Sequence, residues 1–170
     1  YSEEQVSDEK VRAVRQQYGL KDNDVMVLFL GRLVWVKGVD KLIAAMPHIL
    51  QKIPNAKLVI VGLGDMREYL ERMVQSLKLQ DVVKFRFEFI PEEERIAHYA
   101  ACDVAVFPSV YEPFGIVALE GMVAGVPVVA SQVGGLAEVI EHDRTGVFAY
   151  PRSPESIAWG VDHVLSNPDH

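Results

Sequence analysis

Short apolar runs alternate with segments of helical periodicity along the whole chain, and this alternation restricts the fold more than any other feature. A continuous apolar run such as VMVLFL at 25–30 predicts a strand buried on both faces of a sheet. We expect six such strands, at 25–30, 56–62, 82–87, 103–109, 126–131 and 146–150. Strands separated by helical segments indicate βαβ units, so we predict an α/β fold with a doubly wound parallel sheet.

Amphipathic segments fill the spaces between these strands. The segment at 39–53 places its apolar residues on a single helical stripe. We expect the other helices at 7–20, 66–79, 91–102, 115–125, 136–143 and 153–166. Ser7 and Ser153 are suited to be N-caps. A chain of 170 residues is long enough to bury a sizeable core, so we predict one domain over residues 1–170.

Charge and cysteine content exclude several classes of function. The chain has 17 basic and 24 acidic residues, and its net charge of -7 argues against a nucleic-acid partner. A single cysteine, Cys102, excludes an internal disulfide and fits a reducing, cytoplasmic compartment. The five histidines show no metal-ligand spacing, so we expect no metal site. We interpret both ends of the chain as cuts in a longer protein.

The first candidate site is the segment GRLVWVKG, which directly follows the first predicted strand. Doubly wound sheets bind ligands beyond the carboxyl ends of their strands. Arg32 and Lys37 lie five positions apart here, and two such cations can close on a diphosphate from both sides. The alternative is a solvated loop with ordinary surface cations.

The second candidate site is the segment YEPFGIVALEG after the fourth predicted strand. It places Glu112 before a helix and Glu120 inside that helix, among apolar neighbours, where a buried carboxylate needs a partner. Free backbone N–H groups of Phe114, Gly115 and Ile116 open the helix at its positive end. Either the two carboxylates are close by chance, or they bind the hydroxyls of a sugar and a ribose.

Two glycine pairs follow other strands. VGLGD contains Gly62 and Gly64, but Arg67 stands where a dinucleotide fingerprint has its third glycine. We therefore expect a tight strand-to-helix turn in which the backbone approaches a ligand or a neighbouring element. Gly134 and Gly135 at a helix start form either an anion-binding nest or a close turn.

Together, FLGRLVWVKGVDKL, VIVGLGD, VFPSVYEPFGIVALEGMVAGVPVVAS and VGGLAEVI resemble the C-terminal nucleotide-sugar-binding domain of family 4 retaining glycosyltransferases, which have the GT-B fold. The resemblance runs from about residue 7 to the end of the chain. It implies a Rossmann-like donor domain whose N-terminal acceptor domain is missing. The implied reaction moves a sugar from a UDP-, GDP- or ADP-sugar to an acceptor hydroxyl with retained configuration. It also implies that no metal or cofactor is needed and that the isolated domain is inactive.

The resemblance implies a role for each matching side chain. Arg32 and Lys37 would neutralise the donor diphosphate, and with Glu112 they form the expected catalytic set. Glu112 would accept hydrogen bonds from the donor sugar, whereas Glu120 would hold the ribose hydroxyls.

Backbone positions also receive roles from the resemblance. The N–H groups of Phe114, Gly115 and Ile116 would lie close to the sugar and the phosphates. Gly62 and Gly64 would let the nucleotide lie against the loop after the second strand.

Base, acceptor and alternative activities stay open at this point. The family pattern has a glycine near the base, but FRFEFIP places Phe87 or Glu88 there, so the base preference is undetermined. The acceptor is an unknown sugar or lipid-linked sugar, and the missing domain could bring the protein to a membrane. Alternatives to the transferase are a GT-B sugar-nucleotide epimerase and a non-catalytic nucleotide-sugar-binding module.

Overall fold

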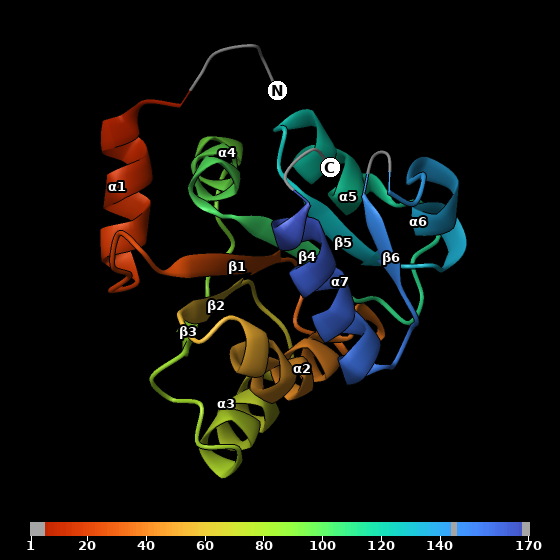
Figure 1. Ribbon diagram of the computed structural model, residues 1–170, viewed down its shortest axis with the longest axis horizontal. Helices are drawn as coiled ribbons and strands as arrows, with labels where there is room; N and C mark the ends of the chain where they lie inside the picture. The colour runs from red at the N-terminus through yellow and green to blue at the C-terminus, as the bar shows by residue number, and fades with distance from the viewer. Residues whose placement is uncertain (1–5, 144–145, 168–170) are drawn as a thin grey trace.

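The computed structural model describes residues 6–143 and 146–167, which form a parallel sheet covered by helices on both faces (Figure 1). Among these residues, six strands pair in the order β3-β2-β1-β4-β5-β6, and every pairing is parallel. The first strand, β1, lies at the centre of the sheet. The next two strands extend the sheet outward to β3, and the chain then returns to form β4 on the other side of β1. This reversal creates a topological switch point between β1 and β4, and it confirms the predicted doubly wound fold.

The strands lie where the apolar runs predicted them. Their bounds are β1 Val25–Leu30, β2 Ala56–Val61, β3 Val83–Arg86, β4 Val104–Phe107, β5 Val128–Ser131 and β6 Val147–Ala149. β1 has the predicted bounds, whereas the other strands are one to three residues shorter than their apolar runs. The trimmed residues belong to the turns that connect each strand to its helix.

The predicted helices are also present. Their bounds are α1 Asp8–Gln17, α2 Val39–Lys52, α3 Arg67–Ser76, α4 Glu92–Ala101, α5 Ile116–Val123, α6 Gly134–Val139 and α7 Pro154–Ser166. The hydroxyls of Ser7 and Ser153 accept hydrogen bonds from the N–H groups of Lys10 and Ser156, as expected of N-caps. A short 3-10 helix, η1 Trp35–Lys37, was not predicted, and α6 begins two residues earlier than expected.

Alternate residues of the central strand face two separate hydrophobic clusters. Val27 and Phe29 pack with α2, α3 and α7 on one side of the sheet. Met26 and Leu28 pack with α1, α4, α5 and α6 on the other side. Because both faces are covered, the strand reads as an unbroken apolar run in the sequence.

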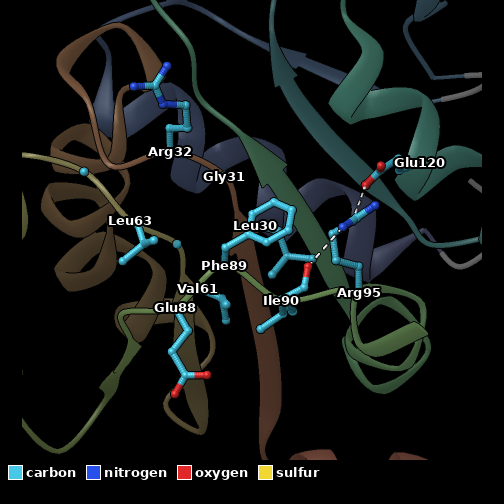
Figure 2. Close-up of a pocket in the computed structure, with 12 residues that line it drawn as sticks. Leu30, Gly31, Arg32, Val61, Leu63, Glu88, Phe89, Ile90, Arg95 and Glu120 are labelled. Atoms are coloured by element: carbon cyan, nitrogen blue, oxygen red, sulfur yellow. Dashed lines mark hydrogen bonds and ion pairs between the residues drawn. The ribbon is translucent and has the colours of Figure 1, made fainter. Parts of the chain in front are cut away.

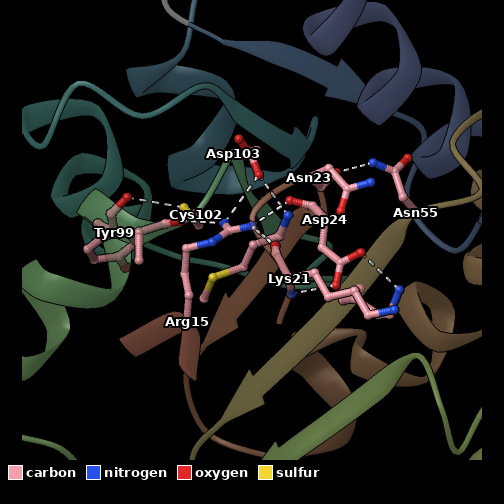
Figure 3. A network of polar contacts seen from close by, with 11 residues as sticks. Arg15, Lys21, Asn23, Asp24, Asn55, Tyr99, Cys102 and Asp103 are labelled. Carbon is pink, nitrogen blue, oxygen red and sulfur yellow. Dashed lines mark hydrogen bonds and ion pairs between the residues drawn. The ribbon is translucent and has the colours of Figure 1, made fainter. Parts of the chain in front are cut away.

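The amino edge of the sheet is joined by a polar network around Arg15 of α1 (Figure 3). The Arg15 guanidinium donates to the carbonyl oxygens of Ala101, Lys21 and Asp24 at 3.1, 3.1 and 2.6 Å. It also lies 3.7 Å from the carboxylate of Asp103, at the amino end of β4. These contacts attach α1 to the amino ends of β1 and β4.

Candidate functional site

A pocket of about 570 Å³ opens at the carboxyl ends of β1 and β2 (Figure 2). Its apolar lining comes from the ends of these strands and from the loops that follow β2 and β3. The apolar side chains are Leu30, Val61, Leu63, Phe89 and Ile90. The pocket lies beside the switch point between β1 and β4, which is where doubly wound sheets bind ligands.

Four charged side chains surround this apolar lining. Arg32 lies at one end of the pocket and Glu88 at the other, while Arg95 and Glu120 occupy a third side (Figure 2). Arg32 and Glu120, which the sequence singled out separately, therefore line one cavity. Arg95 and Glu88 complete the set. Glu88 was indicated by its departure from the family pattern, whereas no motif indicated Arg95.

Arg95 is the partner that the Glu120 carboxylate needs. Its Nε lies 3.5 Å from Oε2 of Glu120, and its Nη1 donates to the carbonyl oxygen of Ile90 at 3.0 Å. Arg95 thus connects the loop after β3 to α5. The sequence contained one signal that Arg95 faces the protein. Arg95 stands four residues before the buried Tyr99, and residues at this spacing lie on the same face of a helix.

Lys37 and Glu112 bind one another outside the pocket lining. The Nζ of Lys37 lies 2.7 Å from Oε2 of Glu112, whose side chain is only 8% exposed. The loop that carries Glu112 follows η1 closely, since the N–H of Val110 donates to the carbonyl of Val36 at 2.9 Å. Lys37 and Arg32 therefore differ, because Glu112 neutralises Lys37.

The start of α5 packs against the start of α6. Gly115, the N-cap of α5, has a φ of 68°, and a Cβ there would lie 2.6 Å from the carbonyl oxygen of Gly135. The N–H of Gly135 donates to the Glu112 carbonyl at 2.7 Å. Gly134 has a φ of 42°, and a Cβ there would lie 2.3 Å from the same Glu112 oxygen. The double glycine is thus a close turn that holds the Glu112 backbone.

Phe114 and Ile116 flank Gly115 at the surface. Their side chains are 71% and 61% exposed. The start of α5 is therefore at the surface, directly after the loop that carries Glu112.

Gly62 and Gly64 line the pocket, and both are required by a neighbouring loop. A Cβ at Gly62 would lie 1.8 Å from the carbonyl oxygen of Gly31, and a Cβ at Gly64 would lie 2.2 Å from that of Leu33. The N–H of Leu33 donates to the Leu63 carbonyl at 2.8 Å. The glycines let the loops after β1 and β2 pack backbone to backbone. This supports the interpretation of VGLGD as a turn whose backbone approaches a neighbouring element.

Three further features bear on the kind of site. Within residues 6–143 and 146–167, no three His, Cys, Asp or Glu side chains gather in a way that could hold a metal ion. None of the helices in this described part is long and apolar enough to cross a membrane. Cys102 is partly buried at the end of α4, where its thiol donates to the Tyr99 carbonyl, and burial raises the pKa of this thiol.

The family model for glycosyl transferases group 1 matches residues 10–170. The chain belongs to this family. The resemblance to GT-B glycosyltransferases that the sequence motifs indicated is therefore confirmed.

Relatives of this group 1 glycosyltransferase chain cover nearly all of it. It is 52% identical over 160 residues to the uncharacterized glycosyltransferase MJ1607 of Methanocaldococcus jannaschii, covering 94% of this chain and 40% of that protein. It is 38% identical to the GDP-mannose-dependent alpha-(1-6)-phosphatidylinositol monomannoside mannosyltransferase of Mycolicibacterium smegmatis, covering 91% of this chain and 42% of that protein.

A solved relative has the same fold. The structure of Anabaena Alr3699/HepE, in complex with UDP and glucose, is 30% identical and superposes with a TM-score of 0.83. The match covers 96% of this chain and 44% of the Anabaena chain. The chain thus spans less than half the length of each of these three relatives.

Proposed function

We propose that this chain binds a nucleoside-diphosphate sugar and is the donor half of a retaining glycosyltransferase. The observation that carries the proposal is one pocket in which Arg32, an apolar lining and the Arg95-bound Glu120 surround a common space. A nucleoside diphosphate has matching parts, namely an anionic diphosphate, a flat base and a ribose with two hydroxyls.

The diphosphate binds at the Arg32 end of the pocket. Arg32 is exposed, and its guanidinium offers a planar set of donors that suits phosphate oxygens. As the sugar–phosphate bond breaks, negative charge grows on the leaving diphosphate, so cations held there stabilise the transition state. The N–H groups at the start of α5 add positive charge on the same side of the sheet.

Lys37 and Glu112 change partners when the donor binds. The Nζ of Lys37 and Oε2 of Glu112 lie 2.7 Å apart, so the two side chains neutralise each other. A diphosphate attracts Lys37 as a counter-ion, and the departure of Lys37 releases the Glu112 carboxylate. Glu112 then accepts hydrogen bonds from the hydroxyls of the donor sugar.

Glu120 accepts hydrogen bonds from the ribose. Its contact with Arg95 involves Oε2, and each carboxylate oxygen carries two lone pairs, so two hydroxyls can still be bound. Arg95 holds the carboxylate at the side of the pocket and balances its charge. A neutralised, fixed acceptor is suited to recognise two adjacent hydroxyl groups.

The relatives support a nucleotide-sugar donor but differ in the nucleotide that their names print. The Anabaena structure contains UDP and glucose, whereas the mycobacterial relative is GDP-mannose-dependent. We also propose that the acceptor and part of the catalytic apparatus belong to an additional domain. The 170-residue chain alone therefore binds donor without transferring sugar.

The experiment is calorimetric titration of the chain with UDP, GDP and ADP and then with their sugar conjugates. Arg32→Ala weakens binding by about 1.5–3 kcal/mol, the contribution of hydrogen bonds to a charged group. Arg72→Ala is the matched control, because Arg72 is exposed on α3 and does not line the pocket. Equal affinities in wild type and Arg32→Ala, or no binding of any nucleotide, would contradict the proposal.

A further inference from the structure

The pocket has a polar side chain at the end that is farthest from Arg32. Figure 2 shows Arg32 and Glu88 at opposite ends, with Val61 and Leu63 among the side chains between them. If the diphosphate lies at Arg32 and the ribose at Glu120, the base lies on the apolar lining and extends toward Glu88. This placement rests on the function proposed above.

Glu88 is held in position by Arg86 at the end of β3. The Nε and Nη2 of Arg86 both donate to Oε2 of Glu88, at 3.2 and 3.0 Å. Arg86 is itself fixed, because its side chain is 17% exposed and its Nη2 also lies 3.0 Å from Oε2 of Glu94. Among the described residues, no contact occupies Oε1 of Glu88, so this oxygen is available to a ligand.

A fixed carboxylate discriminates between bases because it can only accept hydrogen bonds. Guanine has two adjacent donors on one edge, N1–H and the N2 amino group, which match the two oxygens of a carboxylate. Uracil has a single N–H between two carbonyl oxygens, and these oxygens would repel the carboxylate. Adenine places an acceptor nitrogen beside its amino group. Discrimination thus comes from attraction to guanine and from repulsion of the other bases.

We infer that the domain selects a guanine nucleotide as the donor and that Glu88 reads the base. Arg86 is the positioning residue, because it fixes Oε2 and leaves Oε1 without a partner among the described residues. The glutamate that interrupts the expected glycine turn in FRFEFIP is therefore a specificity determinant.

The test is titration of the 170-residue chain with GDP, IDP, UDP and ADP. IDP is GDP without the 2-amino group, so the ratio of GDP to IDP affinity isolates one of the two predicted contacts. We expect GDP to bind at least about tenfold more tightly than each of the others, a factor equivalent to about 1.4 kcal/mol. In Glu88→Gln, the GDP and IDP affinities should become equal within about twofold, since an amide cannot accept both protons.

Glu92→Gln is the matched control, because Glu92 is exposed at the start of α4 and lies outside the pocket lining. It removes the same charge four residues away and should retain the full preference for GDP. An unchanged melting temperature in both variants shows that the fold is intact.

Each other result has a distinct meaning. Tighter or equal binding of UDP or ADP overturns the inference about guanine and leaves the proposed donor site standing. A preference for GDP that survives in Glu88→Gln overturns the role of Glu88. If none of the four nucleotides binds, the proposed function itself is wrong.

Discussion

The two edges of the sheet use the same residue types in opposite ways. At the amino edge, Arg15 donates to three backbone carbonyls and lies beside Asp103. At the carboxyl edge, Arg32 is exposed, and the described residues supply no hydrogen bond or ion pair to it. An arginine whose donors are used by the protein stabilises the fold, whereas one whose donors have no partner among the described residues is available to a ligand.

The carboxylates of the two edges differ in the same way. Asp24 at the amino edge accepts from the N–H of Lys21 at 2.9 Å and from Lys57 at 3.4 Å. The backbone hydrogen bond, assisted by Lys57, lowers the pKa of Asp24. Glu120 at the carboxyl edge has an arginine at 3.5 Å and lines the pocket. The comparison predicts that substitutions at one edge change stability and that substitutions at the other change binding.

The largest expected effect is at the amino edge. Arg15→Ala should lower the free energy of unfolding by about 3 kcal/mol, because it leaves three carbonyl oxygens, two of them in partly buried hydrogen bonds, and Asp103 without their partner. Urea unfolding followed by circular dichroism measures this loss. Nucleotide affinity should not change at temperatures where the variant is folded. A variant as stable as wild type would show that the network around Arg15 is not structural.

The next effect is at the carboxyl edge. Glu120→Ala should weaken the binding of GDP by about 2 kcal/mol, the order of a hydrogen bond to a charged group. The loss should be smaller for 2′-deoxy-GDP, which lacks one of the two ribose hydroxyls. Calorimetry with both ligands gives the difference, and equal losses for the two nucleotides would argue against a ribose contact. Glu71→Ala on α3 is a control, because Glu71 pairs with Arg67 outside the pocket.

A smaller effect tests the exchange of partners between Lys37 and Glu112. Glu112→Gln frees Lys37 from its carboxylate, so a bare nucleoside diphosphate should bind up to about tenfold more tightly, or 1.4 kcal/mol. The same variant should bind the matching nucleotide sugar less tightly, because the sugar loses its acceptor. The two titrations must therefore change in opposite directions. A parallel change in both affinities would mean that Lys37 and Glu112 do not exchange partners.

The smallest effect concerns pH at the amino edge. Because the pKa of Asp24 is lower in the folded state, its ionised form stabilises the fold above the unfolded-state pKa of about 3.9, and this stability is lost as the pH falls through the folded pKa. Asp24→Asn should therefore cost about 0.5–1 kcal/mol at pH 7, the range of a typical hydrogen bond. Unfolding measured from pH 7 to pH 3 should show this difference shrinking. A difference that does not depend on pH would exclude ionisation of Asp24 as its cause.

The sequence predicted the sheet and its helices because burial on both faces imposes local apolar patterns. It also predicted that Glu120 needed a partner. The identity of that partner, Arg95, depends on how α4 and α5 pack, and a single helix pattern does not contain that information. The pairing of Lys37 with Glu112 joins residues 75 positions apart, and for the same reason the two sequence motifs did not reveal it.

Backbone packing also determined features that the motifs left open. Gly62 and Gly64 resembled part of a nucleotide fingerprint, yet the loop at Gly31 and Leu33 already requires them. Gly134 and Gly135 were interpreted as either an anion-binding nest or a close turn. Their contacts with the carbonyl of Glu112 support the close turn. In both cases the deciding atom belongs to a distant loop.

The most direct test of the contrast between the two edges is an amide chemical-shift titration of the chain by NMR. The ligand is the nucleoside diphosphate that binds most tightly in calorimetry. We predict that the shifted amides cluster at Gly31 and Arg32, at Gly62 to Gly64, and in the loop at 88–90, while those around Arg15 and Asp24 do not move. Shifts concentrated at the amino edge, or none at the pocket, would contradict the assignment of donor binding to the carboxyl edge.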